Sequence, residues 1–157
     1  MKKSRIFNKN KNKNKTQPES EKTIFSFNKN LSALIALVVS LDRKNDVIYR
    51  LQKRLSIAIN TDAKLPIEKM GPILYDHKER LLSKSREENE KFFENYDYTT
   101  YDPDEFAVEC IESIKEIYLR SSDMDKEHIV GNLQLLTRKY DEYLNQCAME
   151  ELESEQN

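Results

Sequence analysis

The scarcity of glycine and proline most constrains how this chain can fold. Of 157 residues, two are Gly and four are Pro, so most of the turn residues that a β-sandwich or an α/β sheet needs are missing. The length is typical of one domain, and 38% hydrophobic with 34% charged residues fits a globular core with a polar tail. We therefore expect one all-α domain built from long helices.

Apolar residues recur at spacings of three and four, which predicts four amphipathic helices. The expected helices cover approximately residues 31–60, 72–95, 103–120 and 123–150, within a bundle that spans 24–150. The apolar phase is the same on both sides of "DRKND" (42–46), which favours one first helix, although a break there would give two shorter ones. "SKSREENE" (83–90) has nothing to bury and predicts a charged middle of the second helix.

Several helix boundaries carry specific signals. Pro72 is well placed at the first position of the second helix. Asp102 and Glu105 form a start like a capping box for the third helix, and Ser122 and Asp125 form a second box for the fourth. The apolar spacing of the last helix is typical of a coiled-coil or bundle seam. Short connections favour antiparallel neighbours, so the predicted architecture is an antiparallel four-helix up-down bundle.

Gly131 lies in the middle of the last expected helix, where glycine costs about 1 kcal/mol relative to alanine. If the last two helices fold back near residue 122, Gly131 lies opposite Ile114, and a close approach of the helices would offset that cost. The alternative is an exposed glycine that the helix tolerates. The sequence fits both interpretations equally well.

The two ends of the chain carry opposite charge. Residues 1–23 are rich in Asn and Lys and lack apolar periodicity, so we expect a disordered basic arm. Within it, residues 1–15 carry seven basic residues and no acidic one: Lys2, Lys3, Arg5, Lys9, Lys11, Lys13 and Lys15. From Asp141 to the C-terminus there are six acidic residues and no basic one, and residues 151–157 are expected to form an acidic tail.

The basic arm is the strongest candidate for a binding segment. Its cations would contact an anionic partner such as nucleic acid through phosphates, independently of sequence and with strong salt dependence. The arm lacks arginines interleaved with aromatic residues for base stacking, and it has no apolar face to insert into a membrane. The alternatives are a solubilising spacer, as expected from an AT-rich genome, and a segment that binds acidic protein, including the C-terminus of another copy.

A tyrosine-rich loop is the second candidate for a binding segment. Tyr96, Tyr98 and Tyr101 lie close to acidic residues between the second and third expected helices, a composition typical of protein interfaces. The alternative is that these rings cover the open end of the bundle.

The sequence contains no recognisable catalytic, cofactor or metal motif. His128 and Cys147 lie on one expected helix about 28 Å apart, which is too far to share an ion. Cys110 and Cys147 lie on apolar stripes and are expected in the core, and His77 is expected to be half-buried. Since no nucleophile elbow or Gly-rich phosphate loop is present, we expect neither an enzyme nor a bound cofactor, metal or small-molecule substrate.

Cysteine content and apolar run lengths indicate where the protein acts. Two cysteines fit a reducing compartment, and the longest apolar run (31–41) is shorter than the about 20 residues of a membrane span. We expect an intracellular protein, cytoplasmic or nuclear, that is neither secreted nor transmembrane.

These observations favour a non-enzymatic helical-bundle subunit. The expected role is structural or that of an adaptor: it contacts other protein subunits or further copies of itself in a larger assembly, and the basic arm binds an anionic partner. The alternative is a nucleic-acid-binding accessory or regulatory protein that uses the arm for phosphate contacts. No stretch of the sequence identifies a family.

Overall fold

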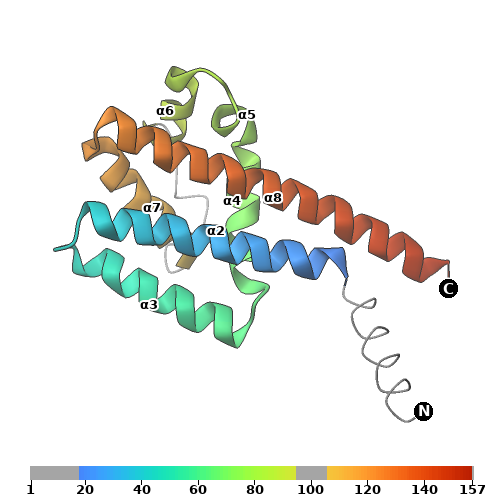
Figure 1. Ribbon diagram of the computed structural model, residues 1–157. Coiled ribbons are helices and arrows are strands. Elements are labelled where there is room, and N and C mark those ends of the chain that lie inside the picture. Colours follow the sequence, from blue (N-terminus) through green and yellow to red (C-terminus); the bar gives the residue numbers. More distant parts are fainter. Residues whose placement is uncertain (1–17, 95–105, 157) are drawn as a thin grey trace, which may run out of the picture.

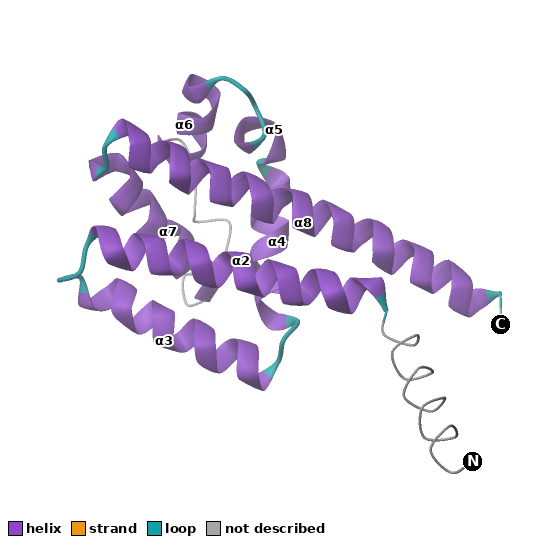
Figure 2. Ribbon diagram, viewed as in Figure 1, coloured by secondary structure: helices purple, strands orange, loops and turns teal. Residues whose placement is uncertain are grey.

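The computed structural model describes residues 18–94 and 106–156, which form seven helices and no strand (Figures 1 and 2). The helices are α2 (Glu19–Leu41), α3 (Asp46–Thr61), α4 (Leu65–Asp76), α5 (Lys78–Leu81), α6 (Arg86–Glu94), α7 (Phe106–Arg120) and α8 (Asp123–Glu155). The expected all-α class is confirmed. A four-helix up-down bundle is not confirmed, because two of the four expected helices are interrupted.

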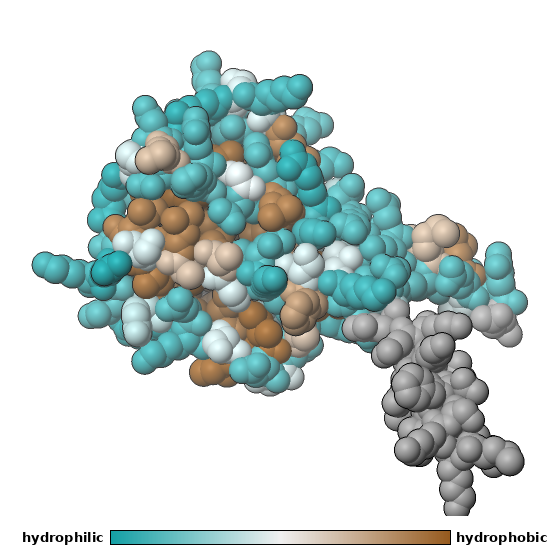
Figure 3. All heavy atoms as spheres, viewed as in Figure 1, coloured by the Kyte–Doolittle hydropathy of each residue, from teal (hydrophilic) through white to brown (hydrophobic). Residues whose placement is uncertain are grey.

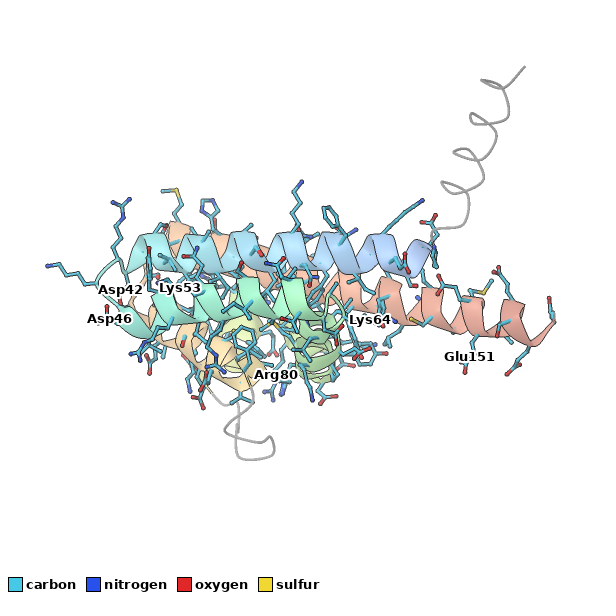
Figure 4. All side chains as sticks on the ribbon, turned by 90° about the horizontal axis from the view of Figure 1, so that it is seen from below. Asp42, Asp46, Lys53, Lys64, Arg80 and Glu151 are labelled. Atoms are coloured by element: carbon cyan, nitrogen blue, oxygen red, sulfur yellow. The ribbon has the colours of Figure 1, made fainter. Side chains whose placement is uncertain are left out.

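In place of the first expected helix, the structure has two antiparallel helices, α2 and α3. The chain reverses between Leu41 and Asp46, and Figure 4 labels Asp46 at this turn. Asn45 caps α3, because its Oδ1 accepts from the backbone N–H groups of Val47 at 3.1 Å and Ile48 at 3.4 Å. Asparagine is one of the strongest N-cap residues. A local cap therefore overrides the continuous apolar phase that favoured one helix.

The second expected helix is replaced by α4, α5 and α6. Pro72 was expected to start a helix, but α4 begins at Leu65 and Pro72 lies inside it. The chain turns between α5 and α6, within the segment expected to be a charged helix middle. The buried Asn89 stabilises this turn, because its Nδ2 donates to the carbonyls of Arg80 (2.7 Å), Leu81 (3.2 Å) and Ser83 (3.1 Å). These bonds satisfy carbonyls left without partners at the end of α5.

The last two helices lie closer to their expected bounds. The hydroxyl oxygen of Ser122 accepts from the backbone N–H of Asp125 at 3.2 Å, so the predicted cap of α8 is confirmed. α8 continues to Glu155, and the expected acidic tail is therefore largely helical. α2 begins at Glu19, within the arm expected to be disordered. The predicted start of α7 at Asp102 lies outside the described residues.

The main partner of α8 is α2, not α7. The two helices run antiparallel, and Ser20 Oγ at the start of α2 donates to Glu150 Oε2 at 2.7 Å. The expected contact of Gly131 with Ile114 is therefore wrong: apart from the adjacent part of α8 itself, no atom of the described residues lies within 4 Å of a Cβ built on Gly131. The alternative, an exposed glycine, is confirmed. Figure 1 shows the C-terminal end of α8 (red) projecting beyond the other helices.

The core lies between α2, α4, α7 and α8. Fully buried side chains include Phe27, Leu31, Leu34, Ile67, Ile73, Ile114, Leu133 and Leu136. The ring of Tyr118 stacks on that of Phe93 at a centroid distance of 3.9 Å, which joins α6 to α7. A Cβ built on Gly71 would lie 2.1 Å from Cδ1 of Tyr140. The absence of a side chain at Gly71 therefore lets α8 pack closely on α4.

Among the described helices, α2 alone is long and apolar enough to cross a membrane. Core helices of soluble proteins and signal sequences near an N-terminus meet the same criterion. In this fold, Phe27, Leu31, Leu34 and Val38 of α2 are completely buried in the core. Length and composition alone therefore do not assign α2 to a membrane.

Candidate functional site

A groove of about 570 Å³ lies between α2, the end of α3 and the α3–α4 connection. We call it the α2–α3 groove. Its apolar lining is Ile24, Phe25, Ile59 and Ala63, and its charged lining is Glu21, Lys29, Asp62 and Lys64. The volume is within the about 300–1,000 Å³ of typical recognition pockets. Figure 4 labels Lys64 where α3 connects to α4.

Large apolar side chains are exposed on α2 and α3, and one of them, Phe25, lines the α2–α3 groove. Phe25 directly follows the buried Ile24 on α2, and 72% of its surface is exposed. Ile57 on α3 is 65% exposed. Figure 3 shows apolar surface (brown) gathered over α2 and α3 on this side of the molecule. Because the core is already filled by the opposite face of α2, this apolar surface is available to a partner.

Asn28 connects the two walls of the groove. Its side chain is buried, and its Nδ2 donates to the carbonyl of Ala63 at 2.8 Å, which fixes the α3–α4 connection against α2. Its Oδ1 is buried and has no donor among the described residues. An unpaired buried acceptor costs about 1–3 kcal/mol. A groove wall therefore contains a polar atom that the fold itself leaves without a partner.

The described residues contain no group of three or more His, Cys, Asp or Glu side chains placed to hold a metal ion. Cys110 is buried, as expected, and burial raises the pKa of its thiol to about 12, so the reactive thiolate does not form near neutral pH. Cys147, expected in the core, is half-buried. Burial, followed by the neighbouring Cys147 side chain, raises the pKa of Tyr143 to about 12. His77 is half-buried, as expected.

The two binding segments expected from sequence lie outside the described residues. Lys2, Lys3, Arg5, Lys9, Lys11, Lys13 and Lys15 belong to residues 1–17, and Tyr96, Tyr98 and Tyr101 belong to residues 95–105. These site assignments remain predictions.

Sequence reasoning missed Phe25 and Asn28. Asn28 lies four residues after Ile24 and three before Leu31, so a polar residue interrupts the apolar stripe of α2. Phe25 is a large aromatic residue next to the stripe rather than on it. Both signals are visible only once the helix is known to begin at Glu19.

No family model, no curated protein and no solved structure matches the chain.

Proposed function

We propose that this protein is a non-enzymatic adaptor subunit that contacts another protein through the α2–α3 groove. The observation that supports this most directly is the exposed Phe25 beside a groove with an apolar lining. Aromatic side chains are enriched at the energetically important positions of interfaces. A partner that covers Phe25 would bury apolar surface that folding leaves in water.

The partner that best fits this groove is an amphipathic helix of another protein. The groove runs beside α2, and helices bind such grooves through apolar residues at i, i+3 or i+4, and i+7. Two acidic residues (Glu21, Asp62) and two basic residues (Lys29, Lys64) line it, so the partner helix would have flanking charges of both signs. A donor such as a Ser, Gln or Trp side chain would pair with Asn28 Oδ1 after a small movement of the wall.

A library of amphipathic helical peptides, selected for binding to the full chain, tests the proposal. We expect enriched peptides to bind the wild type, and Phe25→Glu to weaken binding at least about tenfold because a charge is placed against an apolar face. Met124→Glu is the matched control, because Met124 on α8 is 66% exposed and lies outside the groove lining. Failure to enrich any peptide, or equal losses in both variants, would contradict the proposal.

Sedimentation of the full chain distinguishes binding of a helix from another protein from binding of a second copy of this protein. We expect the wild type and Phe25→Glu to sediment alike over a range of concentrations. A wild-type dimer that Phe25→Glu dissociates would assign the groove to self-association instead of a foreign helix.

A second candidate function rests on the basic arm. We propose that its seven cations bind an anionic partner. This partner is either acidic protein or nucleic acid. Because each neutralised phosphate releases counterions, affinity for DNA or RNA should fall with log salt at a slope of about −0.9 per phosphate contacted on duplex DNA. Replacing the seven basic residues by Gln should abolish that affinity. If this variant is retained on a nucleic-acid column as strongly as the wild type, the arm is not the segment that binds nucleic acid. An intracellular location is part of both proposals.

A further inference from the structure

A second groove, of about 430 Å³, lies between α8 and the turn that joins α5 to α6. We infer that this groove, here called the α6–α8 groove, binds a small phosphate monoester. The inference is independent of the protein contact proposed for the α2–α3 groove, because the two grooves share no lining residue.

Positive charge dominates the lining of the α6–α8 groove. Lys84, Arg86, Lys126 and Arg138 line it with a single acid, Glu127, whereas residues 16–157 together are acidic. Arg86 and Lys126 already have partners: Arg86 donates to the carbonyl of Asp123 at 2.7 Å, and Lys126 Nζ lies 3.9 Å from Glu90 Oε1. Two cations thus remain to bind a ligand.

Those two cations are Lys84 and Arg138. Neither side chain forms a hydrogen bond or ion pair with a described residue. Lys84 comes from the α5–α6 turn and Arg138 from α8, so two separate elements present positive charge to the same groove. Arg138 carries a guanidinium group, whose planar donors match phosphate oxygens.

Two backbone carbonyls beside the groove accept from side-chain amides. Asn89 and Gln134 both line the groove and both donate to the carbonyl of Leu81, at 3.2 Å and 2.8 Å. Asn89 also donates to the carbonyl of Ser83. These two carbonyl oxygens, which would repel a phosphate, are therefore occupied, while the Ser83 hydroxyl can donate to a ligand.

Gly131 keeps the groove open. It lines the groove, and apart from the adjacent part of α8 itself, no atom of the described residues lies within 4 Å of the position of a Cβ there. Leu82 and Val130 add an apolar part to the lining. An anion with a small apolar group fits this combination better than a bare ion, and the volume suits a small molecule.

Titration of the full chain with phenyl phosphate, followed by NMR or calorimetry, tests the inference. We expect saturable binding that is tighter than that of inorganic phosphate, because the ring contacts Leu82 and Val130. Lys84→Ala with Arg138→Ala should weaken binding at least about tenfold, since each charge-assisted bond contributes substantially. Gly131→Leu should abolish binding by filling the groove, and it should leave the fold intact because leucine is a better helix former than glycine.

Arg43→Ala with Lys44→Ala is the matched control. It removes the same charge from two exposed cations in the α2–α3 turn, and it should leave the affinity for phenyl phosphate within about twofold, because neither residue lines the α6–α8 groove. Absence of saturable binding, an equal loss in the control, or normal binding by Gly131→Leu would each overturn the inference. A short oligonucleotide that competes only when the basic arm is present would assign phosphate binding to the arm instead.

Discussion

The two glycines of this chain lie inside helices with opposite surroundings. Gly71 in α4 is buried, and a Cβ there would lie 2.1 Å from Cδ1 and 2.3 Å from Cε1 of Tyr140. Gly131 in α8 is exposed, and the space above it is open. Both positions lose the helix propensity that alanine would provide. At Gly71 close helix packing offsets that loss, whereas at Gly131 nothing in the described fold does.

This difference indicates what each glycine is for. At Gly71 the backbone of α4 contacts the ring of Tyr140, so the glycine belongs to the architecture of the core. At Gly131 the glycine leaves room beside Lys84 and Arg138. Departures from local sequence preference without a structural gain are expected at functional sites, which is consistent with the ligand inferred for the α6–α8 groove.

Gly71→Ala should have the largest effect on stability. The added methyl group overlaps the ring of Tyr140, and overpacking of this kind costs about 1–3 kcal/mol. We expect the free energy of unfolding, measured by urea denaturation with circular dichroism, to fall by that amount.

A double-mutant cycle with Tyr140→Ala checks the cause of this loss. Without the ring, Gly71→Ala should become neutral or stabilising, since residues in contact are energetically coupled. Additive effects of the two substitutions would show that Tyr140 is not what excludes a side chain at Gly71.

Asn89→Ala should destabilise the protein by a similar or smaller amount, about 1–3 kcal/mol, because buried carbonyls lose their donor. The change affects the turn beside Gly131 rather than the packing at Gly71, and it should also weaken phenyl phosphate binding. Asn132→Ala is the control: among the described residues, the Asn132 side chain donates only to the carbonyl of His128 within α8, so its removal should change the unfolding free energy little. Equal losses in both variants would contradict the role assigned to Asn89.

Gly131→Ala should stabilise the protein by about 1 kcal/mol, in contrast to Gly71→Ala, because alanine favours the helix and meets no neighbour. The same denaturation measurement gives the sign directly. A destabilised Gly131→Ala variant would mean that a segment outside the described residues occupies this space.

The sequence predicted the helical class and the cap at Ser122, because both depend on local patterns. It favoured one helix through Asp42–Asn45 and kept the turn there as the alternative, since the apolar phase continues across the turn and the break depends on one cap at Asn45. It also misplaced the partner of α8. Pairing of α8 with α2 brings together residues more than 100 positions apart. The spacing of apolar residues within one helix does not indicate which distant helix it contacts.

The candidate sites were less accessible to sequence reasoning than the fold. The α2–α3 groove depends on Phe25 and Asn28, which lie in the bundle but before the expected start of the first helix at residue 31. The cations of the α6–α8 groove come from α8 and from a turn expected to be helical. Lys84 and Arg138 are 54 positions apart, and nothing in either local pattern indicates that they share a groove. The acidic balance of the body concealed a locally basic surface.

Acidification should lower the free energy of unfolding through His77, next to the helix that contains Gly71. We expect this effect to be the smallest of those predicted. His77 follows α4 directly, and burial, followed by the positive charge of Arg80, lowers its pKa from the usual 6.5. The unfolded chain therefore binds a proton more readily than the folded chain, so stability is full above pH 6.5 and falls as the pH drops through that value. The unfolding free energies of the wild type and His77→Gln should be compared across this pH range. We expect the wild type to lose more unfolding free energy than His77→Gln as the pH falls. A difference that is independent of pH would show that His77 titrates alike in both states.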